Sequence, residues 1–277
     1  SPHSPFVAND EDSKGFENLD DKSKNHYGEL VAFDRSLGTL RTRLRELNIA
    51  ENTIVWYCSD NGGLPGIKPG TVGDLRGNKG DIWEGGIRVP GIVEWEGQIT
   101  PNITHFPAST MDIFPTIIDL LNLPDSYLLQ PVDGISLKPL IQNEKVKIRN
   151  KPIPFKFQKY GALIDNDLKL VVTNVGQGSF ELYDLQQDRR ESTDISNDKP
   201  KQFEELKKKF NQWHESAQNS IWAGEQICSV YIADCRACFG SCRGSYNTVG
   251  LYAGRCSHAV CLHSFCSGAE AEPCRNV

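Results

Sequence analysis

The sequence predicts an α/β fold, with a mostly parallel sheet flanked by helices, followed by a small antiparallel sheet and a C-terminal helix. Three observations predict it. Residues 23–47 have helical periodicity, residues 53–58 form a run of consecutive apolar side chains, and short strand-like segments follow residue 151. A consecutive apolar run is typical of a strand covered on both faces, as in a parallel sheet between helices.

The helix predicted over residues 23–47 carries one apolar stripe. Apolar side chains recur at alternating spacings of three and four, while Arg and Glu occupy the opposite side. A turn at 49–53 then leads into the apolar strand. The residues of the stripe are Tyr27, Leu30, Phe33, Leu37, Leu40, Leu44 and Leu47.

Two further elements complete the first part of the chain. Residues 87–95 form a second strand-like run that Pro90 interrupts, and residues 109–124 predict a helix with an early Pro115 and a stop at Pro124. The order helix, strand, loop, strand, helix indicates an α/β domain over residues 1–150.

The pattern changes at residue 151. The segments 160–165, 168–175 and 180–185 predict short strands, and Asn-Asp or Gly-rich turns separate them. An amphipathic helix over 199–213 closes this small antiparallel sheet. We therefore expect a subdomain over residues 151–222 and a separate tail over residues 223–277.

The tail differs in composition from the rest of the chain. Eight of the nine cysteines lie in it, and lysine does not occur after Lys209. An even number of cysteines fits a disulfide framework in an oxidising compartment. Zinc ligation and a frameshifted or misread end are the alternatives, and a spurious end is expected to be disordered and not to pack.

Composition excludes several classes of function. The net charge is −6 and no basic stripe is visible, so we expect no nucleic-acid partner. No stretch approaches the roughly 20 apolar residues of a membrane-spanning helix, so we expect no membrane span.

The strand at 53–58 ends abruptly at Ser59-Asp60-Asn61-Gly62-Gly63. Asn-Gly between apolar residues is a strong hairpin signal, but the Gly/Pro-rich loop that follows offers no immediate partner strand. The end of a buried parallel strand is the better interpretation, because open α/β sheets place ligands there. Asp60 and Asn61 would present oxygen ligands to Ca²⁺, with Mg²⁺ as a second candidate.

Two more residues are candidates for anion chemistry. Lys79, between small residues and flanked by Arg76 and Arg88, is suited to bind a tetrahedral oxyanion beside a cation site. His3, between two prolines, is suited to orient an anion or protonate a leaving group. Taken singly, a loop lysine is usually a solvated surface group, and a terminal histidine often has no role.

These segments together resemble the sulfatase family of the alkaline-phosphatase-like superfamily, over residues 1 to about 222. The motifs that carry the resemblance are SPHSPFVA at the start, the segment from YGELVAF to SDNGG, and LRGNKGDIWEGGIRVPGIVEWEG, with STMDIFPTIIDLL, VDGISLKPL and FELYDLQQDRRESTDIS after them.

The resemblance implies an arylsulfatase-like sulfuric ester hydrolase. Asp60 and Asn61 would be two calcium ligands, Lys79 would bind the sulfate and help bind or protonate the ester oxygen, and His3 would contact the sulfate or leaving group. It also implies a sulfated small molecule or carbohydrate as substrate, and a secreted, periplasmic or lysosomal location.

The family's formylglycine nucleophile comes from a Cys/Ser-x-Pro/Ala-x-Arg motif, which this sequence does not contain, and the early Asp-Asp metal pair is also missing. We therefore expect a C-terminal portion of a sulfatase that does not turn over sulfate esters alone. The alternatives are a phosphodiesterase or phosphonate hydrolase of the same superfamily, and a non-catalytic remnant with a Cys-rich binding tail.

Overall fold

The computed structural model describes residues 3–128, 130–235, 252–256 and 259–263. The chain divides into two compact units, residues 1–217 and 218–277. The first unit contains residues 1–150 and residues 151–217 of the predicted part 151–222, and the division at residue 150 stays a prediction. Among the described residues, no helix has the length and apolar character needed to cross a membrane.

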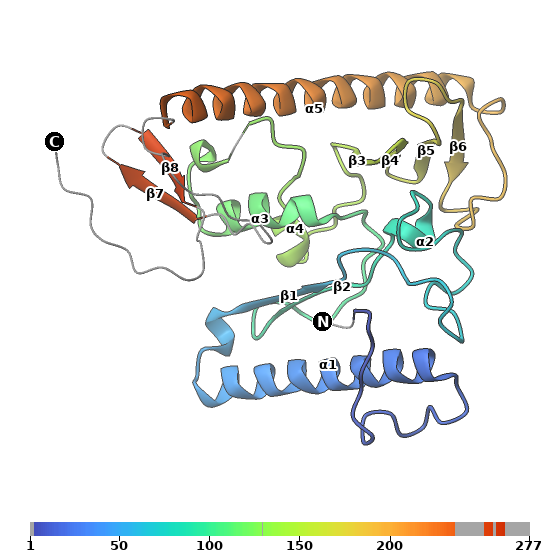
Figure 1. Cartoon of the computed structure of the whole chain (residues 1–277), viewed down its shortest axis with the longest axis vertical. Helices are drawn as coiled ribbons and strands as arrows, with labels where there is room; N and C mark the ends of the chain where they lie inside the picture. The colour runs from blue at the N-terminus through green and yellow to red at the C-terminus, as the bar shows by residue number, and fades with distance from the viewer. Residues whose placement is uncertain (1–2, 129, 236–251, 257–258, 264–277) are drawn as a thin grey trace. The chain divides into compact units, whose positions relative to one another are not determined.

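The first helix and strand pair follow the predicted order (Figure 1). Helix α1 spans Asp21–Glu46, a short 3-10 turn spans Ala50–Asn52, and β1 (Ile54–Cys58) pairs with β2 (Gly91–Trp95). The rings of Phe33 on α1 and Tyr57 on β1 lie 5.6 Å apart between centroids. Helix α1 therefore packs against the strand pair through its apolar stripe.

The expectation of parallel pairing is wrong for these two strands. β1 and β2 are antiparallel, with Ile54 opposite Trp95 and Cys58 opposite Gly91. All five residues of β1 are half-buried. A consecutive apolar run indicates that both faces of a strand are covered, but it carries no information on the direction of the neighbouring strand. The predicted direction was wrong for this reason. The mostly parallel sheet is not present among the described residues.

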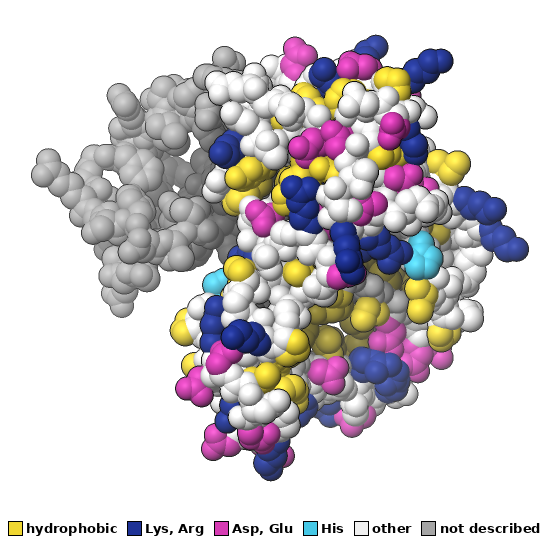
Figure 2. Space-filling model, turned by 90° about the vertical axis from the view of Figure 1, so that its right-hand side faces the viewer, with side chains coloured by type: hydrophobic (Ala, Val, Ile, Leu, Met, Phe, Trp, Pro, Cys, Tyr) yellow, Lys and Arg dark blue, Asp and Glu magenta, His cyan; other side chains and the backbone are white. Residues whose placement is uncertain are grey.

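Much of the apolar stripe on α1 is open to solvent. Leu30, Leu40 and Leu47 are exposed, although each lies on the predicted apolar face. Figure 2 shows hydrophobic side chains at the surface, among interspersed acidic and basic groups. The helix is thus confirmed, but the described residues cover only part of its stripe.

The segment after β1 contains short helices. Helix α2 spans Glu84–Ile87, α3 spans Ile113–Leu120, and α4 spans Lys138–Ile141. Two 3-10 turns lie at Thr110–Asp112 and Asp125–Tyr127. The helix predicted over 109–124 is confirmed in shorter form, because Asn122 takes a positive φ of 50° just after α3 and Pro124 follows.

The second part of this unit is a four-stranded antiparallel sheet in the order β3-β4-β5-β6. Three of its strands were predicted, and β3 was not. Pro154 in β3 lacks a backbone donor, which restricts such a strand to a sheet edge, and β3 is an edge strand. The strands span Ile153–Phe157, Tyr160–Asp165, Leu168–Val172 and Phe180–Asp184.

The two faces of this sheet bury different partners. On one face, Leu163, Leu170 and Leu182 pack with Leu206 and Phe210 of helix α5 (Pro200–Cys235). A set that alternates with these residues along the strands packs on the other face: Ala162, Val171 and Tyr183, with Ile82 and Trp83 from the loop before α2. The sheet therefore lies between α5 and the segment that contains Lys79.

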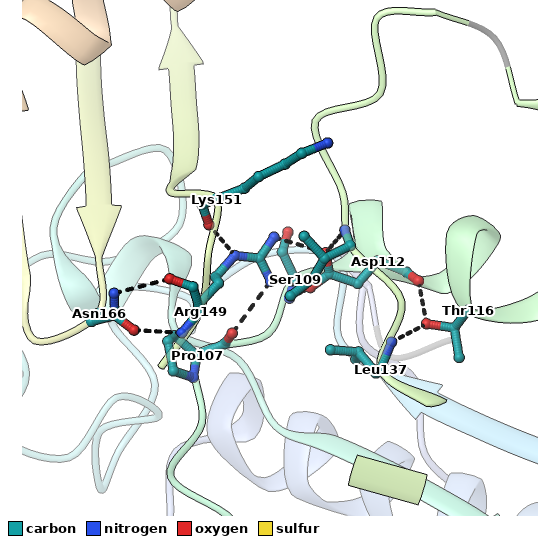
Figure 3. A network of polar contacts seen from close by, with 9 residues as sticks. Pro107, Ser109, Asp112, Thr116, Leu137, Arg149, Lys151 and Asn166 are labelled. Atoms are coloured by element: carbon teal, nitrogen blue, oxygen red, sulfur yellow. Dashed lines mark hydrogen bonds and ion pairs between the residues drawn. The ribbon is translucent and has the colours of Figure 1, made fainter. Parts of the chain in front are cut away.

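A buried ion pair joins α3 to the sheet (Figure 3). Arg149 binds the carboxylate of Asp112 through both terminal nitrogens, at 2.7 and 2.8 Å, and both side chains are fully buried. The backbone of Arg149 is bound in turn by Asn166, in the turn between β4 and β5. Paired charges of this kind are tolerated in a core because every polar atom finds a partner.

The second unit contains the end of α5 and a hairpin of β7 (Tyr252–Cys256) and β8 (Ala259–His263). Residues 236–251, 257–258 and 264–277, where most of the cysteine-rich tail lies, fall outside the described residues. The predictions of a disulfide framework, a zinc site or a spurious end therefore stay predictions.

The charged N-cap of α1 predicts a pH dependence of stability. The backbone N–H and hydroxyl of Ser23 bind the Asp20 carboxylate at 3.0 and 2.9 Å, and they lower the pKa of Asp20 below its ordinary value of 3.8. A lowered pKa adds stability above 3.8 that is lost as the pH falls through the folded-state value. Asp20→Asn keeps the cap but cannot ionise.

We expect Asp20→Asn to have a lower Tm than wild type at neutral pH, because the helix N-terminus favours a negative charge. The difference should shrink as the pH falls below 3.8. Thermal melts from pH 7 downward measure it, with Asp10→Asn, an exposed acid outside the helix, as control. A pH-independent difference contradicts the charged cap.

Candidate active site

The turn after β1 presents two oxygen-bearing side chains. Asp60 is exposed and Asn61 is half-buried. Within the described residues, neither side chain makes a hydrogen bond or ion pair, and the Asn61 carbonyl accepts a bond from Ser59 Oγ at 3.0 Å. The carboxylate and the amide oxygen are therefore both free to bind a ligand.

Glycine packing fixes this turn against the segment that contains Lys79 (residues 76–86, the lysine loop). Gly62 N–H donates to the Gly86 carbonyl at 2.8 Å, and a Cβ on Gly62 would lie 1.9 Å from the Gly85 carbonyl oxygen. A Cβ on Gly85 would lie 2.2 Å from the carbonyl oxygen of Gly77. A side chain at either position would collide with backbone. The close approach of the two loops therefore requires glycine at Gly62, and the folding of the Lys79 loop on itself requires glycine at Gly85.

Lys79 lies on the second of these loops and is joined to the first. Its backbone N–H donates to the Gly63 carbonyl at 2.8 Å, two residues after Asn61. Its side chain is exposed, and Nζ lies 3.4 Å from Nε2 of His3, which is also exposed. The structure thus brings together two candidates that are 76 positions apart in the sequence.

The histidine tautomer follows from its other contact. His3 Nδ1 lies 2.9 Å from the Ser4 carbonyl oxygen, which can only accept a hydrogen bond, so Nδ1 carries the proton. Nε2 then has a lone pair and accepts a hydrogen bond from the Lys79 ammonium. The imidazole thereby orients the ammonium at the surface.

The segment that carries His3 is anchored along α1. Val7 N–H donates to Glu29 at 2.7 Å, and Ala8 N–H donates to Asn25 at 2.9 Å. Asp12 forms an ion pair with Arg35 of α1, and this guanidinium holds the pKa of Asp12 below its ordinary value. The anchoring positions the His3 loop relative to the body of the unit.

Arg76 and Arg88, which flank Lys79, are engaged elsewhere. The Arg76 guanidinium lies 3.4 Å from the centroid of the Trp83 ring and donates to the Glu191 carbonyl at 2.8 Å. Arg88 pairs with Glu84 at 3.0 Å. Both arginines stabilise the loop, and Lys79 is the cation of this group that extends toward His3.

A buried ionic cluster lies under the lysine loop. Lys169 on β5 is fully buried, and its Nζ is 3.0 Å from Glu84 of α2 and 2.7 Å from Glu191. Glu84 also donates its backbone N–H to Glu191 Oε2 at 2.6 Å. Burial raises the pKa of Glu191, and the neighbouring Lys169 charge opposes that rise. The cluster attaches α2 to the antiparallel sheet.

Comparison with known proteins assigns the family. The sulfatase family model matches residues 1–123. The sulfatase of Formosa agariphila is 30% identical over 225 residues, covering 69% of this chain and 40% of the relative. Human arylsulfatase A is 37% identical over 114 residues, covering 40% of this chain and 22% of the relative. The chain belongs to the sulfatase family.

A solved structure supports the α/β sulfatase fold. The structure of Ps i-CgsB in complex with k-i-k-neocarrahexaose matches with a TM-score of 0.65 and 28% identity, covering 77% of this chain and 48% of that chain. The chain thus spans less than half the length of each of these three proteins. The family match contains every predicted site residue: His3, Asp60, Asn61 and Lys79.

A sulfatase is expected to hold a metal ion, and the described residues supply two candidate ligands for it. Within the described ranges, no group of three or more His, Cys, Asp or Glu side chains could hold a metal ion. Asp60 and Asn61 have the hard oxygen donors that Ca²⁺ prefers, but they supply two of its usual six to eight. They therefore fit a calcium site as part of its ligand set.

Sequence reasoning missed the buried cluster of this sulfatase chain. Lys169 interrupts the apolar run Leu168–Val172, which is itself a signal, because a lysine inside a buried strand requires an acidic partner. The partners Glu84 and Glu191 are 85 and 22 positions away, and no spacing rule links them. Their role emerges only from the packing of the loop on the sheet.

Substitution of Lys169 tests the role of this cluster. Lys169→Met should destabilise the chain by about 3–5 kcal/mol, because it leaves the buried carboxylate of Glu191 without a counter-charge and Glu84 with Arg88 alone. Urea denaturation measures the loss, with Lys208→Met on the exposed side of α5 as control. Adding Glu191→Gln should recover part of the stability. Equal effects of the Lys169 and Lys208 substitutions rule out the role of the cluster.

Substitution of Gly85 tests the glycine contact. Gly85→Ala should cost about 1–3 kcal/mol, because the added methyl group must displace backbone, and it should speed hydrogen exchange at the Lys79 amide. Gly70→Ala is the matched control, since a Cβ there meets nothing within 4 Å. Unchanged exchange at Lys79 in Gly85→Ala is the opposing result.

Proposed function

We propose that the chain takes part in the hydrolysis of sulfate esters, with Lys79 and His3 binding the sulfate group and the ester oxygen. The observation that carries the proposal is the approach of Lys79 Nζ to His3 Nε2 at 3.4 Å, beside the loop that holds Asp60 and Asn61. The sulfatase names of the relatives favour a sulfate ester over a phosphate diester.

Each side chain has a distinct task in this proposal. The Lys79 ammonium offers a full positive charge to the sulfate oxygens, together with the two N–H donors that His3 does not occupy. Its proton is also available to the bridging oxygen as negative charge develops on the leaving group. His3 orients the ammonium through Nε2, and this nitrogen becomes available to the substrate when the ammonium turns toward the sulfate.

The proposal also includes a calcium ion at the turn after β1. Asp60 and Asn61 would hold it together with further oxygen ligands. When bound, such an ion reduces the negative charge on the sulfate oxygens. The sequence contains no Cys/Ser-x-Pro/Ala-x-Arg motif, so no residue of this chain is assigned as the formylglycine nucleophile.

The substrate class in this proposal is a sulfated carbohydrate or small molecule. Support comes from Ps i-CgsB, 28% identical to this chain, whose structure contains an oligosaccharide. A secreted, periplasmic or lysosomal location belongs to the same proposal.

Sulfate binding tests the proposal on the full chain. Lys79→Ala should weaken binding of inorganic sulfate by about tenfold or more, because a charged hydrogen bond to the anion is lost. Isothermal titration at low ionic strength measures the Kd, since salt screens exposed charges.

Lys208→Ala is the matched control, as another exposed lysine far from His3 in sequence. Lys79→Arg keeps the charge and should retain part of the affinity. Unchanged sulfate affinity in Lys79→Ala, or an equal loss in Lys208→Ala, would falsify the proposed anion site.

A further inference from the structure

A cavity lies between the end of β2 and the helices α3 and α4. Its volume is about 240 Å³. Trp95, Leu120 and Ile141 contribute apolar surface to its wall, and Asn122, Gln98 and Gln142 contribute carboxamides. None of the residues assigned to sulfate binding lines this cavity, so it is a separate candidate site.

The hydrogen-bonding edge of Trp95 is already occupied. Its indole N–H donates to the Glu51 carbonyl at 2.7 Å. This bond fixes the orientation of the ring, and only the carbon surface of the indole remains to contact a ligand. An aromatic surface held in one orientation is suited to stack against a flat apolar patch.

The cation in the wall is neutralised. Lys138 Nζ donates to the Asp119 carbonyl at 2.9 Å, to its carboxylate at 3.0 Å, and to Asn122 Oδ1 at 3.3 Å. These three bonds use all three ammonium donors. Ser136 Oγ binds the same carboxylate at 2.6 Å and, with Lys138, keeps the pKa of Asp119 low. The wall therefore offers no free charge to an anion.

The carboxamides in the wall are free. Within the described residues, the side-chain amides of Gln98 and Gln142 make no hydrogen bond, and both residues are exposed. Asn122 accepts from Lys138 through Oδ1, which leaves its NH₂ group to donate. Each free carboxamide of glutamine presents one acceptor and two donors.

We propose that this cavity binds an uncharged pyranose sugar. The C–H face of a pyranose stacks on the Trp95 ring, while its hydroxyl groups both donate to and accept from the carboxamides. The combination of an oriented aromatic surface, free amides and no free charge matches a neutral polyhydroxylated ligand and disfavours a sulfate or phosphate group. The inference does not depend on the proposed sulfate site.

Ligand-observed NMR on the full chain tests the site. The probes are methyl β-D-galactopyranoside and methyl β-D-glucopyranoside, and we expect saturation transfer from the protein to at least one of them, with a Kd on the order of 1 mM. Gln142→Ala should weaken that binding about fivefold, as expected for the loss of one neutral hydrogen bond.

Gln202→Ala is the matched control, since Gln202 is an exposed glutamine on α5 and should leave the Kd unchanged. A 6-O-sulfated form of the bound sugar should bind no more tightly, because the Lys138 charge is already paired. Absence of binding of both sugars, or equal Kd values for wild type and Gln142→Ala, overturns the proposal. The proposal is also overturned if the sulfated sugar binds more tightly than the neutral sugar and Gln142→Ala weakens the binding of the sulfated sugar.

Lys79→Ala separates this inference from the proposed function. It should abolish most sulfate binding and leave the neutral sugar Kd unchanged, because Lys79 does not line the cavity. Loss of neutral sugar binding in Lys79→Ala overturns the independent site.

Discussion

The buried charge of Lys169 is the interaction on which the arrangement of this unit depends. A lysine inside an apolar strand is stable only with its counter-charges in place, and those come from α2 and from the loop after β6. The sheet therefore cannot close on that face without the Lys79 segment packed against it. The charges of the cluster determine where the Lys79 segment packs on the sheet. In that position Ile82 and Trp83 bury additional apolar surface against the sheet.

The candidate site uses backbone more than side chains for its support. The turn after β1 and the loop of Lys79 approach so closely that only glycine fits at Gly62, and the loop of Lys79 folds back on itself so closely that only glycine fits at Gly85. Main-chain hydrogen bonds then fix the separation of the two loops. Such a base is stiff, while Lys79 itself extends into solvent, where it can reorient toward an anion. Rigid support beneath a free terminal group is the arrangement expected of a binding site.

Sequence patterns predicted the elements better than their pairing. The helical period of α1 and the turn residues that separate β4, β5 and β6 are local signals, and the elements they predicted are confirmed. The direction of β2 is a long-range property, and the local pattern could not contain it. The candidate site residues were predicted because their types and order resemble a family, whereas the Lys169 cluster joins three distant segments and has no pattern in sequence.

The bond from the Lys79 amide to the Gly63 carbonyl has a thermodynamic consequence. It connects the turn with Asp60 and Asn61, which would bind the cation, to the loop of Lys79, which would bind the anion. Ordering either loop therefore also restrains the other. Occupancy at Asp60 and Asn61 would then raise the affinity at Lys79, and the anion would raise the cation affinity by the same factor. The two ligands would behave as a cooperative pair even where they do not touch.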